Sequence, residues 1–217
     1  MSLLTRLLGR KRPFTSSGEY WAERYARGRT SGPGSYGRLA DYKAEVINAL
    51  VAEQRIESVV EFGCGDGNQA SLFKFDNYTG VDVVEQVVRA NSERFADRPS
   101  WQFITTEQDA QRADIFDMSM SLDVIYHLVE DNVFDAYMLR LTRAADRYVL
   151  IYATDEDRPR PEDHVRDRKY SDWMARNAPG FVEERMWANP HAADVDDLNP
   201  KDTTRAFFRL YRREGRA

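Results

Sequence analysis

VVEFGCGDGNQ, residues 59–69, places three glycines within five positions, directly after an apolar run. Glycine loses more conformational entropy on folding than any other residue, so this spacing indicates a backbone that turns sharply or approaches another group closely. The apolar run over residues 57–63 predicts a buried parallel strand that ends at the first glycine. We therefore expect a strand, a glycine loop and a following helix, with the loop at the carboxyl edge of a parallel sheet, where ligands bind.

Hydrophobic periodicity on both sides of the loop predicts alternating strands and helices. The expected strands are 57–63, 78–84, 101–105, 116–122, 147–155, 181–187 and 205–213, and the expected helices are 39–54, 68–75, 85–96, 131–145 and 169–178. Because no helix is predicted between the last two strands, they should pair in antiparallel fashion. Residues 1–36 are predicted to be irregular. The expected fold is α/β, a Rossmann-like seven-stranded sheet that is mostly parallel, with an antiparallel C-terminal strand pair and helices on both faces.

Composition limits the function classes. The 217 residues suffice for one α/β domain, and the net charge of −5 argues against nucleic-acid binding by the whole chain. Residues 1–38 nevertheless carry a net charge of +6, so we expect a basic arm or lid over residues 1–37 and the main domain over residues 38–217. Cys64 is the only cysteine, which fits a reducing compartment. The absence of a long apolar run or a secretory signal makes the cytoplasm the expected location.

The glycine spacing separates classes of nucleotide site. A dinucleotide fingerprint requires G-x-G-x-x-G, but the chain has G-x-G-x-G, and the third glycine of the fingerprint is replaced by Asn68. The Lys-Ser/Thr pair of a phosphate-binding P-loop is absent. Asp82 lies at the end of the second predicted strand, where a carboxylate can accept both hydroxyls of a ribose. The pattern therefore predicts a site for an adenosine cofactor.

These motifs resemble those of class I S-adenosylmethionine-dependent methyltransferases. The resemblance rests on the glycine stretch with YTGVDV (78–83), on FDMSMSLDVIYHL (116–128) and on the two final strands, and it covers residues 38–213. It implies S-adenosyl-L-methionine as cofactor, with Glu61 orienting the loop, Asp82 holding the ribose and Val83 flanking the adenine. Glu107, Gln108 and Asp109 remain alternatives for the contact to the adenine amine. The cofactor-binding candidates are Glu61, Gly63, Cys64, Gly65, Gly67, Asp82, Val83, Asp109 and Asp123.

Methyl transfer to a hydroxyl requires a group that removes its proton. His127 follows the fourth predicted strand at the ligand-binding edge, and Asp123 precedes it by four residues and is placed to hold its tautomer. The alternative is that His127 packs beside the cofactor or joins the cap of the next helix. His164, in the charged loop after the fifth strand, is the reserve candidate. The catalytic candidates are therefore His127, Asp123 and His164.

Two segments are candidates for acceptor recognition. Aromatic residues precede the first helix of the fold, in a region that closes over the cofactor as a lid in related enzymes. The loop over residues 155–168 mixes arginines with carboxylates, a composition that suits a polyhydroxylated acceptor. It resembles no metal-binding motif, so we expect no metal. The substrate-binding candidates are Tyr20, Trp21, Tyr25, Tyr36, Tyr126, His164 and Arg166.

The leading hypothesis is O-methylation of a sugar or oligosaccharide hydroxyl by a chain similar to bacterial sugar O-methyltransferases, such as those that act on mycobacterial methylmannose polysaccharide precursors. The partner would then be a small molecule or an oligosaccharide, with no nucleic acid and no membrane span, and a homodimer is left open. RNA or protein methylation anchored by the basic arm is the second hypothesis. A NAD-dependent protein is the third, and Asn68 argues against it.

Overall fold

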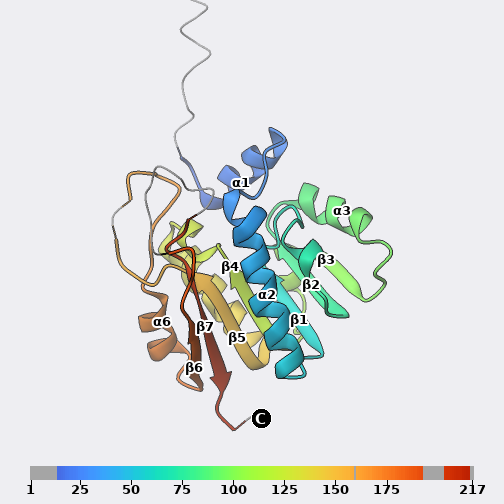
Figure 1. Cartoon of the computed structure of the whole chain (residues 1–217). Helices are drawn as coiled ribbons and strands as arrows, with labels where there is room; N and C mark the ends of the chain where they lie inside the picture. The colour runs from blue at the N-terminus through green and yellow to red at the C-terminus, as the bar shows by residue number, and fades with distance from the viewer. Residues whose placement is uncertain (1–13, 159, 193–202, 216–217) are drawn as a thin grey trace, which may run out of the picture.

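The computed structural model describes residues 14–158, 160–192 and 203–215. Its centre is a seven-stranded sheet with strand order β3-β2-β1-β4-β5-β7-β6 (Figure 1). The strands are β1 (Ser58–Phe62), β2 (Asn77–Asp82), β3 (Trp101–Thr105), β4 (Phe116–Leu122), β5 (Ala145–Ala153), β6 (Phe181–Trp187) and β7 (Phe207–Arg213). The first five are parallel, and β7 runs antiparallel to both β5 and β6. The predicted fold class is confirmed.

Helices cover both faces of the sheet and bury separate apolar clusters. The helices are α1 (Ser17–Ala26), α2 (Gly37–Glu53), α3 (Glu85–Arg94), α4 (Thr106–Ala110), α5 (Asp131–Arg143) and α6 (Tyr170–Asn177). One cluster joins α2 and α3 to the sheet through side chains such as Ile47 and Val88. The other joins α5 and α6 to the opposite face through Met138 and Trp173. Within the described ranges, none of the helices combines the length and apolar character needed to cross a membrane.

The helix predicted over residues 68–75 is wrong. This segment contains only a 3-10 turn at Ala70–Leu72 and then runs extended into β2. Phe73 and Phe75 are buried while Lys74 between them is exposed, which is the alternation of an extended chain. The Asn48 side chain of α2 donates to the Leu72 carbonyl and accepts from the Lys74 amide, at 3.0 and 2.9 Å. Packing of two aromatic rings therefore overrides the local helical pattern.

The irregular structure predicted for residues 1–36 is also wrong over α1. The Ser16 side chain caps α1 by accepting a hydrogen bond from the Glu19 amide. Trp21 and Tyr25 are one helical turn apart and pack together against Val84 and Val87. Helix α1 lies beyond the amino-terminal end of α2, above the sheet end that carries the glycine loop (Figure 1). Half of the Lys and Arg residues in residues 1–38 lie outside the described residues, namely Arg6, Arg10, Lys11 and Arg12.

Candidate functional site

A cavity of about 530 Å³ opens at the carboxyl ends of β1, β2 and β4, between α1 and α5. The predicted site residues that line it are Trp21, Tyr25, Glu61, Gly63, Cys64, Gly65, Asp82, Val83, Asp109, Asp123 and His127. The predicted site residues outside its lining are Tyr20, Tyr36, Gly67, Tyr126, His164 and Arg166. All cofactor candidates except Gly67 therefore line one cavity, whereas most acceptor candidates lie outside its lining.

The glycine loop adopts a backbone conformation that side chains rarely tolerate. Gly63, Gly65 and Gly67 have φ angles of +86°, +56° and +73°. A Cβ on Gly65 would overlap the hydroxyl of Ser31, and a Cβ on Gly67 would overlap the side-chain amide of Asn91 in α3. The second glycine therefore makes room for the N-terminal segment, and the third allows α3 to approach the loop.

Asp82 joins the glycine loop to the end of β2. Its carboxylate accepts hydrogen bonds from the amides of Gly65 and Val84, at 2.9 and 3.0 Å. Burial raises the pKa of Asp82, and these amide donors oppose the increase. A carboxylate held by two backbone amides at the cavity wall is oriented to accept further donors, such as ribose hydroxyls.

The sequence analysis missed Lys43, which reaches the cavity from α2. Its side chain is only 1% exposed, and its ammonium group lies 2.6 Å from the carboxylate of Asp123. Asp123 has a φ of +60° and also accepts a 2.8 Å hydrogen bond from Tyr126. The predicted role of Asp123 in holding the His127 tautomer is therefore wrong, because its carboxylate faces Lys43 and Tyr126 instead. The signal in the sequence was a lysine among the apolar positions of a predicted helix.

Glu61 is buried at the end of β1, beside this pair. The Tyr78 hydroxyl donates to its carboxylate at 2.5 Å. Burial raises the pKa of Glu61 to about 7, although Tyr78 and the charge of Lys43 oppose the increase. The charges of Lys43, Asp82 and Asp123 all act on Glu61, so three acidic groups and one ammonium group lie close together, and this excess of acidic groups suits a cationic ligand.

His127 lies in the 3-10 turn Ile125–His127 after β4 and lines the cavity. Its Nδ1 is 3.2 Å from the His164 carbonyl oxygen. Because a carbonyl can only accept, Nδ1 carries the proton and Nε2 is left unprotonated in the neutral ring. Burial lowers the pKa of His127 to about 4. The imidazole is therefore neutral near pH 7, in the tautomer that a proton-accepting Nε2 requires.

Two aromatic rings from α1 pack against the two histidines. Trp21 packs edge-on against the imidazole with ring centres 5.0 Å apart, and Tyr20 stacks on His164 at 4.2 Å. The rings of His127 and His164 are nearly parallel, with centres 6.0 Å apart. The predicted aromatic and histidine candidates therefore come together at one side of the cavity, although Tyr20 and His164 do not line it.

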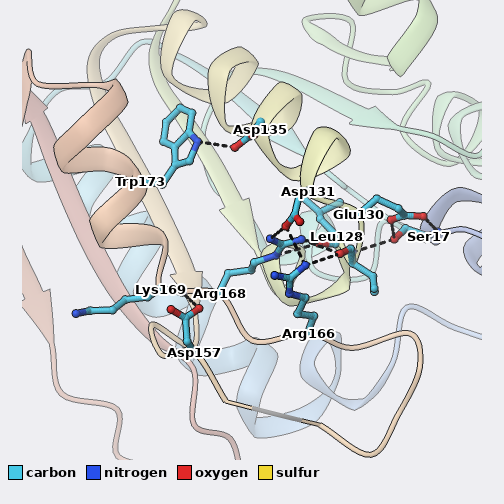
Figure 2. Close-up of polar contacts among 11 residues, drawn as sticks. Ser17, Leu128, Glu130, Asp131, Asp135, Asp157, Arg166, Arg168, Lys169 and Trp173 are labelled. Atoms are coloured by element: carbon cyan, nitrogen blue, oxygen red, sulfur yellow. Dashed lines mark hydrogen bonds and ion pairs between the residues drawn. The ribbon is translucent and has the colours of Figure 1, made fainter.

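The charged loop after β5 is held by ion pairs, most of them to α5 and β7. Arg166 and Arg168 converge on Asp131 at the start of α5 and on the backbone of Leu128 and Val129 (Figure 2). Arg160 pairs with Asp167, Arg209 pairs with Asp155, and the Asp157 carboxylate accepts from the Lys169 amide. A role of Arg166 in binding the acceptor stays a prediction, and its guanidinium already pairs with Asp131. Across the described ranges, no three His, Cys, Asp or Glu side chains gather as a metal site.

The N-terminal segment between α1 and α2, residues 29–36, closes over the glycine loop. The Ser31 amide donates to the Asp66 carboxylate, and the Asp66 amide donates back to the Ser31 hydroxyl, at 2.7 and 2.9 Å. The Tyr36 hydroxyl donates to the same carboxylate, and the Asn68 side chain donates to the Ser35 carbonyl. The predicted candidate Tyr36 thus holds this segment in place, and Asp66 is a residue that the sequence analysis missed.

The opposite end of the cavity is bounded by α4 and α5. Asp109 is buried there, and its two carboxylate oxygens accept from Arg140 at 2.7 and 2.8 Å. Val83 is 46% exposed and lines the same end. A contact from Asp109 to the adenine amine stays a prediction, since its carboxylate already has a partner.

The cavity fits an adenosine cofactor with a cationic methionine end. Val83 and Asp109 border one end, Asp82 lies at the wall, and the acidic group around Lys43 lies at the other end. Gln69 lines the cavity, and its buried carbonyl oxygen has no hydrogen-bond partner within the part of the chain described. The amide nitrogen of the same side chain donates to the Ala40 carbonyl, which fixes the orientation of the amide. An unpaired acceptor oxygen is compatible with a ligand that donates.

Comparison with known proteins agrees with this arrangement. A family model described as a methyltransferase domain matches residues 60–148. The structure is similar to the N-methyltransferase NodS from Bradyrhizobium japonicum in complex with S-adenosyl-l-homocysteine, with 13% identity, 92% of this chain and 100% of that chain covered, and a TM-score of 0.70.

Two further solved structures are similar. Magnesium protoporphyrin IX methyltransferase (ChlM) from Synechocystis with bound SAM has 15% identity, covers 94% of this chain and 100% of that chain, and has a TM-score of 0.63. An O-methyltransferase family protein from Burkholderia thailandensis has 12% identity, covers 81% of this chain and 56% of that chain, and has a TM-score of 0.59. No curated protein matches the chain. At these identities the similarities establish the fold.

Proposed function

We propose that this chain, whose residues 60–148 match a methyltransferase domain model, is an S-adenosylmethionine-dependent methyltransferase that transfers the methyl group to a hydroxyl of a sugar or oligosaccharide acceptor. The cofactor supplies a methyl carbon that its sulfonium makes electrophilic. The protein has to align the acceptor oxygen with that carbon and remove the hydroxyl proton.

Four features of the cavity would hold the cofactor. Asp82 would accept the ribose hydroxyls, Val83 would flank the adenine, and the backbone of the glycine loop would contact the methionine end. The carboxylates of Glu61 and Asp123 would provide a negative field beside the positively charged sulfur and ammonium groups, with Lys43 limiting the excess of negative charge. This arrangement favours a cationic cofactor over a pyrophosphate, which would meet carboxylates.

The neutral imidazole of His127 is the observation that carries the choice of O-methylation. Its Nδ1 proton is directed to the His164 carbonyl, so Nε2 is free of a proton. As the acceptor oxygen takes the methyl group, its proton would pass to Nε2. A positioned base of this kind contributes about 10²–10⁴-fold to the rate. Because the buried ring is only weakly basic, it would contribute to the rate mainly through its position beside the acceptor oxygen rather than through its affinity for the proton.

The aromatic residues beside His127 support a sugar acceptor. Trp21 lines the cavity, and Tyr20 and His164 form a stacked pair next to it. Flat apolar rings close to a polar base match the faces and hydroxyls of a sugar ring. Arginines of the loop after β5 already pair with carboxylates of the protein, so the proposal of a sugar acceptor rests on these rings.

Transfer of a labelled methyl group from S-adenosylmethionine to panels of glycans, RNA, proteins and phenols tests this function. We expect a glycan to be labelled and His127→Ala to lower kcat by about 10²–10⁴-fold, with little change in cofactor affinity. His191→Ala is the matched control, because His191 packs on Tyr42 and is outside the cavity lining. Labelling of RNA or protein alone would replace the sugar proposal, and a near-normal kcat in the His127 variant would remove its role as base.

A further inference from the structure

Arg24 lies on α1 next to Trp21, which lines the cavity, although Arg24 itself is outside the lining. It follows Trp21 by three residues, which places both side chains on one helical face. Its guanidinium carbon lies 5.5 Å from the centre of the Trp21 ring, and its Nε donates to the Thr30 carbonyl at 2.6 Å. Trp21 is in turn edge-on to His127. Arg24 is therefore next to the wall that carries the candidate base.

Arg24 differs from the other cations around the site because it lacks a carboxylate partner. Lys43 pairs with Asp123, Arg140 pairs with Asp109, and both Arg166 and Arg168 pair with Asp131. On α1 itself, Arg27 pairs with Glu23. Within the described ranges, Arg24 forms no ion pair, and the only hydrogen bond of its side chain is the one from Nε to the Thr30 carbonyl. Its two terminal nitrogens, which can grip an anion in bidentate fashion, are available.

The charge of Arg24 also affects the pKa of His127. The Arg24 side chain is partly buried, so its charge is less screened by water than that of an exposed arginine. Burial is the main cause of the lowered pKa of His127. The charge of Arg24 lowers that pKa further, because it opposes protonation of the ring, whereas the charge of Asp123 raises it. An anion bound at Arg24 would offset this effect and make the imidazole a stronger base.

We propose that Arg24 binds an anionic group of the acceptor, so that the sugar methylated at this site carries a carboxylate or a phosphate. This inference rests on the proposed function, since it assigns the acceptor class of the same site. The aromatic rings of Tyr20 and Trp21 would contact the sugar face while the guanidinium holds its acidic group. Binding of the anion would also place a negative charge near His127 at the moment when the base is needed.

The experiment compares neutral and anionic forms of the same sugar as acceptors: methyl glucoside against methyl glucuronide, and mannose against mannose 6-phosphate. We expect the anionic member of at least one pair to have the higher kcat/KM, by about tenfold to a hundredfold, the range for hydrogen bonds to charged groups. Arg24→Gln should bring kcat/KM for the anionic sugar down to the value for its neutral counterpart and so remove that preference. Arg27→Gln, on the same helix with its own partner Glu23, should keep it.

Calorimetry with S-adenosylhomocysteine shows whether each variant retains a folded cofactor site, and Arg24→Met, which removes the charge but keeps a long side chain beside Trp21, replaces Arg24→Gln if that variant fails this check. Preference for the neutral sugar, or an unchanged ratio in the Arg24 variant, overturns this inference and leaves the proposed function intact. If no sugar of either kind is methylated, the proposed function fails and this inference fails with it.

Discussion

At the scale of single residues, Asp82 joins the glycine loop to the end of β2 and is the predicted acceptor for the ribose of the cofactor. Its carboxylate accepts the amides of Gly65 and Val84 and lines the cavity. Replacing Asp82 with Ala should weaken S-adenosylmethionine binding by about tenfold to a hundredfold, because the ribose hydroxyls lose their charged acceptor. Calorimetry measures the change, with the exposed Asp97→Ala as control. Equal affinity in a folded Asp82 variant would exclude Asp82 from the site.

His127 sets the expected pH dependence. The protonated ring cannot accept a proton, so the rate should rise as pH increases through the pKa of His127 and then stay level. The sequence alone suggested a rise near pH 6.5, the ordinary value for histidine. Because burial lowers the pKa to about 4, we expect a level single-turnover rate between about pH 5.5 and 8. A rate that climbs tenfold across that range would contradict the assignment.

At the scale of elements, Asp66 is the latch between the glycine loop and residues 29–36. It exchanges two hydrogen bonds with Ser31 and accepts a third from Tyr36. Asp66→Ala should release this segment, so that trypsin cleaves faster at Arg27 and Arg29 and S-adenosylhomocysteine dissociates faster. The exposed Asp76→Ala serves as control for general loss of charge. Unchanged proteolysis and dissociation would show that the segment is held by packing alone.

The whole molecule separates into a sheet core and an N-terminal cover. Among the described residues, none before Tyr42 belongs to the two apolar clusters on the sheet faces, whereas Tyr25 belongs to a third cluster, with Val84 and Val87. Deleting residues 1–36 should therefore leave cooperative urea unfolding in place and abolish or strongly reduce methyl transfer, since elements that close over a site exclude water. Full activity after truncation would make the cover dispensable. The division into an arm over residues 1–37 and a domain over residues 38–217 stays a prediction.

Local patterns in the chain were sufficient for the sheet and the position of the cavity. The apolar runs predicted all seven strands, and the glycines followed by Asp82 identified the edge where the cavity opens. These features depend on neighbouring residues, because strand burial and left-handed turns are encoded within a few positions. The same local patterns failed at residues 68–75, where packing of Phe73 and Phe75 against distant elements prevents the helix.

The chemistry of the site depended on contacts between residues far apart in the chain. Lys43 meets Asp123 across 80 residues, and the His164 carbonyl sets the His127 tautomer across 37. Spacing in the sequence suggested Asp123 as the partner of His127, but in the folded protein its carboxylate pairs with the buried Lys43. A charged side chain takes its partner from whatever the tertiary packing places beside it, since leaving a buried charge unpaired costs more than any local preference provides.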